Sequence, residues 1–191
     1  MTTPSQADLT AVPARYTAVA MLLHWVLAVA ILTAFSVGLY VEGLPFSPSK
    51  LKLINWHKWA GVAILALSLL RLVWRLAHRP PALPARIEQA MPHWQRVAHH
   101  GTHHLMYLLF LAVPLLGWAY SSAKGYPIVW LGVLPLPDFV SPDPALADAL
   151  KPLHALAAWG LIGLVALHVV AALKHQFIDR DGLLDRMRPG R

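Results

Sequence analysis

Long apolar stretches alternate with short polar segments along this chain, and four of the stretches are long enough to cross a bilayer. They run roughly over residues 18–40, 55–77, 101–120 and 153–174. A hydrocarbon core ~30 Å thick requires about 20 apolar residues in helical conformation. The pattern therefore predicts an all-α membrane protein built as a bundle of four transmembrane helices.

The domain organisation follows from the residues that these helices leave over. Outside the helices there remain a tail at 1–17, three connections and a basic tail at 175–191, too little chain for a second globular domain. We expect one transmembrane domain over residues 18–174. The first apolar stretch is long for a signal-peptide core and no clear small-residue cleavage site follows it, so we interpret it as a retained helix.

The distribution of charge predicts the orientation of the chain in the membrane. Hydrophobic residues make up 57% of the sequence, and eleven of the sixteen Lys and Arg residues lie in the two tails and around the 78–100 connection. By the positive-inside rule, this connection and both termini are expected in the cytoplasm, with the 41–54 and 121–152 connections facing outward. The net charge of +7 thus reflects topology, and without a supporting motif we expect no nucleic-acid partner.

Two histidines lie fourteen residues apart on the last apolar stretch, at His154 and His168. On a helix they would be ~21 Å apart along the axis and within ~40° of the same face. An unpaired polar group in hydrocarbon costs several kcal/mol, so each imidazole needs a partner or a metal. The spacing indicates two metal centres at two depths.

Alternating helix directions give each of these histidines a partner at its own depth. His24 shares the inner depth with His168, and His57 shares the outer depth with His154. Two imidazoles from facing helices are suitable axial ligands for haem b, and the absence of cysteine excludes haem attached through thioether bonds. Zinc is disfavoured because each pair lacks the three or four protein ligands that it prefers.

Three further polar residues near the inner depth have open interpretations. Arg71, fourteen residues after His57, either extends to the lipid headgroups or serves as a counter-ion for a haem propionate or a quinone headgroup. His100 and His103 lie one turn apart, and they are either solvated at the helix mouth or handle protons or quinone there. Replacement of His24 as a ligand by one of them is a further alternative.

The ordered set of motifs resembles the bacterial cytochrome b561 family. The motifs are HW in the first helix, HK-x-x-G followed by RLVWR in the second, H-x-x-H-x-x-x-Y in the third and H-x13-H in the fourth. Each motif is short, but their order is specific, and the resemblance covers the chain from about Tyr16 to Met187. It implies an inner-membrane cytochrome with two haems b and ubiquinone as redox partner, and with axial ligands at His24, His57, His154 and His168.

The resemblance also implies electron transfer between the quinone pool and a donor on the outer side. In one small type of member the donor is superoxide, guided by positive charge. In this chain that charge would come from Lys50, Lys52, Lys58, Lys124 and Lys151, opposed by three aspartates in the 121–152 connection.

Other functions compete with this one. The main alternative is a cytochrome subunit that anchors, or exchanges electrons with, a partner dehydrogenase, hydrogenase or periplasmic protein. A scaffold or transporter without haem would leave four depth-matched histidines unexplained. A homodimer in the bilayer is a further option, although no Gly-x-x-x-Gly pair in the helices argues for it.

Overall fold

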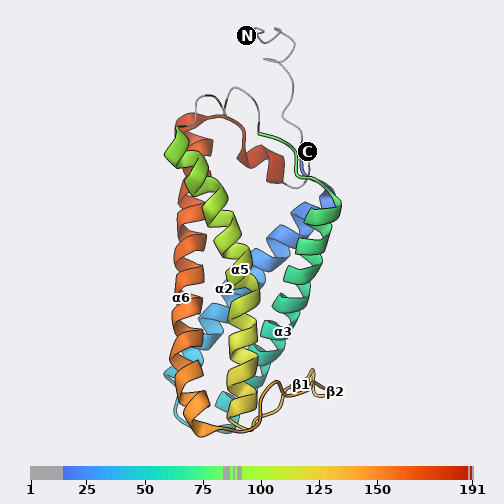
Figure 1. Ribbon diagram of the computed structural model, residues 1–191, viewed down its shortest axis with the longest axis vertical. Coiled ribbons are helices and arrows are strands. Elements are labelled where there is room, and N and C mark those ends of the chain that lie inside the picture. The colour runs from blue at the N-terminus through green and yellow to red at the C-terminus, as the bar shows by residue number, and fades with distance from the viewer. Residues whose placement is uncertain (1–14, 84–86, 88, 90–91, 189, 191) are drawn as a thin grey trace.

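Four long helices form an elongated bundle in the computed structural model (Figure 1). It describes residues 15–83, 87, 89, 92–188 and 190, without the side chains of His93, Trp94, His99 and His100. The helices are α2 (Ala18–Glu42), α3 (Pro48–Ala77), α5 (His93–Ala123) and α6 (Pro144–Lys174). All four are long and apolar enough to cross a membrane, which confirms the predicted fold class.

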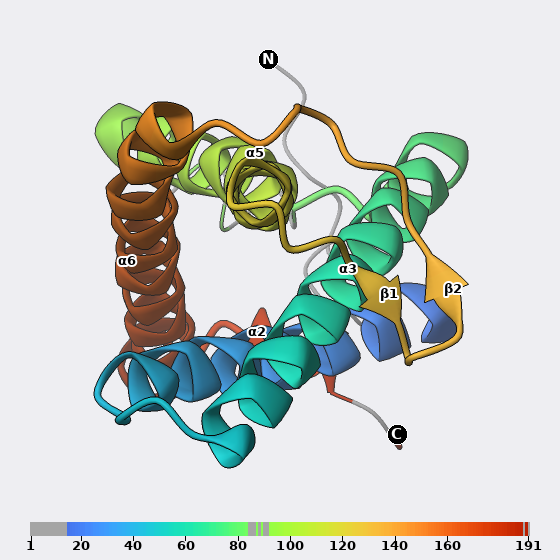
Figure 2. The same ribbon diagram turned by 90° about the horizontal axis from the view of Figure 1, so that it is seen from below.

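The two ends of the bundle differ in what closes them. At the end called here the terminal end, α2 begins and α6 finishes; at the opposite hairpin end, β1 (Val129–Trp130) pairs antiparallel with β2 (Leu134–Pro135) (Figure 1). Seen along the bundle in Figure 2, α5 packs against α6, α2 against α3, and α3 against α5. Successive helices run in opposite directions, as the pairing of histidines by depth requires.

Two helices begin earlier than hydropathy predicts, because capping residues fix their starts. The Ser47 side chain accepts a hydrogen bond from the amide of Lys50 (3.2 Å), and α3 starts at the next residue, a proline, rather than near 55. Asp143 likewise accepts from the amide of Leu146 (3.1 Å), and α6 starts at a proline rather than near 153. Such caps with proline in the first turn are strong helix starts. The two outward connections are therefore shorter in the structure than predicted from the sequence.

Helix α5 also begins earlier than predicted, at His93 instead of near 101. His100 and His103 therefore lie inside the helix and not at its mouth. Helix α5 continues through Pro114, which is tolerated where neighbouring helices pack around it.

The buried core is an apolar layer in the middle of the bundle. It consists of Leu27, Ile31, Ala34, Ile64 and Leu161, which come from the stretches between the two ends of α2, α3 and α6. Many large apolar side chains outside this layer are exposed, as expected for a surface that faces lipid. The core therefore separates the two ends of the bundle by a layer of low polarity.

The C-terminal segment, which the sequence predicts as a tail, folds back over the terminal end. A π-helical turn (η1, His175–Asp179) ends α6, and a short 3₁₀ helix (η2, Leu184–Met187) follows. Arg186 is only 3% exposed and donates hydrogen bonds to the carbonyl oxygens of Pro81 (2.8 Å) and Ala82 (2.9 Å). These bonds hold the segment against the loop that follows α3.

Candidate functional site

Two histidines face each other between α3 and α6 near the hairpin end. The ring centroids of His57 and His154 are 6.2 Å apart, with an angle of 87° between the ring planes. The Nδ1 atom of His57 lies 3.0 Å from the carbonyl oxygen of Ala34, and that of His154 lies 3.0 Å from the carbonyl oxygen of Val113. A carbonyl oxygen can only accept, so Nδ1 carries the proton in both rings. Nε2 of each ring then keeps its lone pair for a metal.

A glycine lies behind each of these rings. A Cβ atom on Gly38 would lie 3.1 Å from Cε1 of His57, and one on Gly117 would lie 3.0 Å from Cε1 of His154. Both distances are shorter than ordinary van der Waals contacts, so a larger residue would push the ring away. Since a helical side chain leans over the preceding turn, each glycine also leaves uncovered the carbonyl oxygen four residues earlier, the one that the histidine uses.

This arrangement occurs twice, once on α2 and once on α5, and it was not predicted from the sequence. The available signal was an isolated glycine in the first and third apolar stretches at the depth of the outer histidines. Glycine inside a membrane helix marks a close approach of another element. The contact partner could not be read from the sequence, because it depends on how each helix is rotated.

A second pair lies near the terminal end, between α2 and α6. The ring centroids of His24 and His168 are also 6.2 Å apart, with 73° between the ring planes. His103 of α5 lies beside them, with its centroid 5.3 Å from that of His168. The structure thus brings together both predicted pairs, and His103 with the inner one. The side chain of His100 lies outside the part of the chain that the structure describes.

The separation within each pair fits two axial ligands of one iron. An imidazole nitrogen binds a first-row metal at about 2 Å, and the ring centroid lies about 1 Å beyond it, so two opposed imidazoles have centroids about 6 Å apart. Both pairs match this value. The shorter separation between His103 and His168 favours His24 as the partner of His168.

Two buried polar atoms on α3, near the inner pair, lack hydrogen-bond partners among the described residues. Arg71 Nε donates a hydrogen bond to the hydroxyl oxygen of Tyr107 on α5 (3.1 Å), so this guanidinium contacts a neighbouring helix. Its Nη1 atom and the Oγ atom of Ser68, three residues earlier, are buried and have no hydrogen-bond partner among the described residues. Buried polar atoms usually have partners, so the pair indicates a place for a group that accepts hydrogen bonds.

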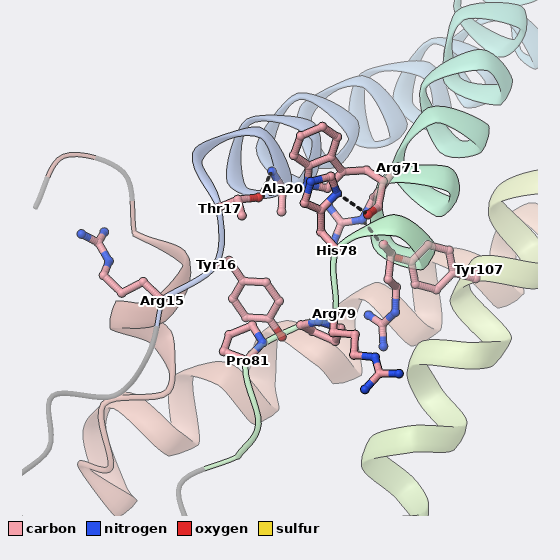
Figure 3. A pocket seen from close by; sticks show the side chains of 12 residues that line it. Arg15, Tyr16, Thr17, Ala20, Arg71, His78, Arg79, Pro81 and Tyr107 are labelled. Atoms are coloured by element: carbon pink, nitrogen blue, oxygen red, sulfur yellow. Dashed lines mark hydrogen bonds between the residues drawn. The ribbon is translucent and has the colours of Figure 1, made fainter.

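A cavity of about 140 Å³ adjoins Arg71 at the terminal end (Figure 3). Four arginines, Arg15, Arg71, Arg75 and Arg79, are among its lining residues, together with aromatic side chains that include Tyr107. None of its lining residues, all within the described chain, is acidic. The cavity therefore has a positive potential that favours an anion.

The lysines at the hairpin end are partly neutralised. Lys124 forms an ion pair with Asp148 (3.4 Å), and Lys151 forms one with Glu42 (2.9 Å). Lys58, next to His57 in the sequence, instead donates to a backbone carbonyl oxygen, so its charge is not paired by that contact. The positive field expected at this end is weaker than the number of lysines suggests.

Comparison with known proteins agrees with this architecture. Residues 15–190 match the family described as prokaryotic cytochrome b561. Cytochrome b561 homolog 2 of Escherichia coli (strain K12) is 32% identical over 177 residues, covering 92% of this chain and 92% of that protein. A probable superoxide oxidase, CybB, of Yersinia pestis is 31% identical over 180 residues, covering 92% and 96%. Both histidine pairs lie within the range matched by the family. The chain therefore belongs to the prokaryotic cytochrome b561 family of membrane-spanning haem b proteins that transfer electrons.

Proposed function

We propose that this protein is a cytochrome with two haems b that moves electrons between a donor at the hairpin end and ubiquinone. The observation that carries the proposal is the occurrence of two histidine pairs with the same centroid separation of 6.2 Å. They lie toward opposite ends of the bundle, ~21 Å apart along α6 at 1.5 Å per residue. Two sites at two depths are what electron transfer across a bilayer requires.

In this proposal, His57 and His154 ligate one haem, and His24 and His168 ligate the other. Haem b supplies one-electron redox chemistry when it is bound. Two imidazole ligands leave no open coordination position, which favours electron transfer over oxygen activation. The bonds from Nδ1 to the backbone carbonyls at the hairpin end orient both rings and make Nε2 more basic.

The terminal end is the proposed place of contact with an anion or a quinone. Arg71 and Ser68 offer buried polar atoms to a propionate or to the headgroup of ubiquinone. His103, beside His168, is our candidate for proton or quinone handling. The basic residues at this end support a cytoplasmic location for it and for both termini, in a bacterial inner membrane, by the positive-inside rule.

Superoxide is the proposed donor at the outer side. The name of the relative from Yersinia pestis supports it, as does the positive charge of Lys58, which follows His57 in the sequence and donates to a backbone carbonyl oxygen. Two superoxide ions would each lose one electron to give two molecules of dioxygen. One ubiquinone would take both electrons and two protons to give ubiquinol.

The ion pairs at the hairpin end favour a second candidate. Since Lys124 and Lys151 are paired with carboxylates, attraction of a small anion is reduced, and a protein donor becomes an alternative. In that case the chain is a membrane-anchor subunit, or an electron carrier for a dehydrogenase, hydrogenase or periplasmic protein.

Two measurements test these proposals. The purified holoprotein should contain two non-covalent haems b per chain, and one haem or none would refute the dihaem proposal. The same protein should accelerate ubiquinone reduction under a superoxide flux, whereas His154→Ala, which lacks an outer ligand, should not. A rate equal to that of a protein-free control would refute superoxide as donor and favour the anchor subunit.

A further inference from the structure

The connection between α5 and α6 contains an uncharged apolar segment over residues 126–137, called here the hairpin segment. Its sequence is YPIVWLGVLPLP. Several of its apolar side chains are strongly exposed, among them Leu131 (55%), Val133 (79%) and Leu134 (52%). An apolar group of this kind at a protein surface usually marks a contact with lipid or with another protein.

The hairpin segment is fixed to the flank of α3 and not beyond its end. Trp59 Nε1 donates to the carbonyl oxygen of Val129 (2.7 Å), and Trp130 Nε1 donates to the carbonyl oxygen of Trp59 (3.1 Å). Trp59 lies ~16 Å along α3 from its start at Pro48. Figures 1 and 2 show β1 and β2 projecting sideways from the bundle beside α3. The segment therefore lies alongside a membrane-spanning helix, where tryptophans favour the interface.

Hydrogen bonds within the protein satisfy much of the backbone of the hairpin segment on either side of its tip, which suits a segment in contact with lipid. Lys58 Nζ donates to the carbonyl oxygen of Tyr126 (3.1 Å), and Trp118 Nε1 donates to that of Pro137 (3.1 Å). Between these points the two strands bond to each other. A loop in water can leave its carbonyl groups to solvent, whereas lipid offers no hydrogen bonds.

The turn at the tip keeps an apolar residue in an unfavourable conformation. Leu131 has φ of 53°, in the left-handed region, and it precedes Gly132 with φ of 76°. Glycine or asparagine adopts this conformation with less strain. A leucine at this position is explained if its exposed side chain gains an apolar environment.

We propose that the tip of the hairpin segment, formed by Leu131, Val133 and Leu134, inserts into the lipid leaflet at the hairpin end. Lipid is the expected occupant because the segment is apolar and lies beside the membrane-spanning helix α3, where lipid is the surrounding medium. Apolar side chains of α3, such as Leu51 and Trp56, are exposed as well. The segment would anchor the rim of the bundle at the membrane surface.

The test uses a unique cysteine, since the chain has none. Val133→Cys in the holoprotein is labelled with bimane and reconstituted in phosphatidylcholine liposomes. The matched control is Ser141→Cys, exposed in the polar part of the same connection. We expect blue-shifted emission at 133 and at least severalfold stronger quenching by doxyl-labelled lipid than at 141, with the reverse order for aqueous iodide.

Two outcomes would overturn the proposal. Emission at 133 that is as water-like and as accessible to iodide as at 141 would show a solvated loop. Protection at 133 from both quenchers would show contact with protein, within an oligomer or a partner. If the Val133 variant loses haem or helical content, Leu134→Cys provides the same measurement at the neighbouring position.

Discussion

His154 donates a hydrogen bond from Nδ1 to the carbonyl oxygen of Val113, and Gly117 lies one turn after that carbonyl. On α2, His57 makes the same contacts with Ala34 and Gly38. The missing side chain of each glycine leaves room both for the ring and for its hydrogen bond. Each outer histidine is thereby held in one tautomer and one orientation before any metal binds.

Gly117→Ala should weaken haem binding at the hairpin end. The new Cβ would lie 3.0 Å from Cε1 of His154, and the ring cannot move away without stretching its bond to Val113. Loss of such supporting contacts typically costs about 10- to 100-fold in metal affinity. Haem content and a potentiometric titration should show one of two components lost or shifted, and the other unchanged.

The matched control is Gly160→Ala on α6, where an added Cβ meets nothing within 4 Å. It should keep both haems, and because alanine favours helix, its stability should change by at most ~1 kcal/mol in the stabilising direction. Equal effects of the two substitutions would contradict the role given to Gly117.

His168→Ala should remove the haem at the terminal end and leave the other in place. His24→Ala should have the same effect, because the two rings have the separation of opposed ligands. In contrast, His103→Ala should retain two haems, since its ring lies too near that of His168 for both to bind one iron from opposite sides. The pyridine haemochrome assay measures the number. Loss of haem in His103→Ala with retention in His24→Ala would reverse the assignment.

The sequence predicts the helices well where apolar residues are continuous, and less well where polar residues begin a helix. Lys50 and Lys52 lower the hydropathy of the first turns of α3, so its start was placed too late. Ser47 followed by proline was the local signal that the hydropathy pattern did not include. Depth along a helix, by comparison, needs only residue spacing, which is why His57 and His154 could be paired in advance.

Contacts between helices could not be predicted in the same way. Whether His24 or His103 faces His168 depends on the rotation of α2 and α5 about their axes, which packing of many side chains determines. The supporting role of Gly38 and Gly117 depends on the same rotations.

Arg71→Gln should lower the midpoint potential of the inner haem. A positive charge stabilises the reduced form, and one unit charge ~10 Å away at an effective dielectric constant of ~20 contributes about 1.7 kcal/mol. For one electron this corresponds to a shift of about 70 mV. A redox titration should show the lower potential for one component only.

The control for Arg71→Gln is Arg79→Gln, which removes an exposed guanidinium from the same cavity. Water and salt screen that charge, so its shift should be much smaller. If both variants behave like the unchanged protein, Arg71 does not act on the haem, and contact with a headgroup would explain it better.

Arg186→Ala should release the C-terminal segment from the terminal end. The buried guanidinium of Arg186 bonds to the carbonyl oxygens of Pro81 and Ala82, and hydrogen bonds from charged groups contribute about 1.5–3 kcal/mol each. Loss of the equivalent of one such bond, ~2 kcal/mol, already raises the population of the released segment about 30-fold. Chymotrypsin should therefore cleave after Phe177 or Met187 about 10- to 30-fold faster, provided that cleavage follows this local opening.

The control is Arg188→Ala, which removes only an exposed ion pair with Asp185 (3.1 Å) and should change the cleavage rate little. Equal cleavage rates in the Arg186 and Arg188 variants would show that Arg186 does not hold the segment.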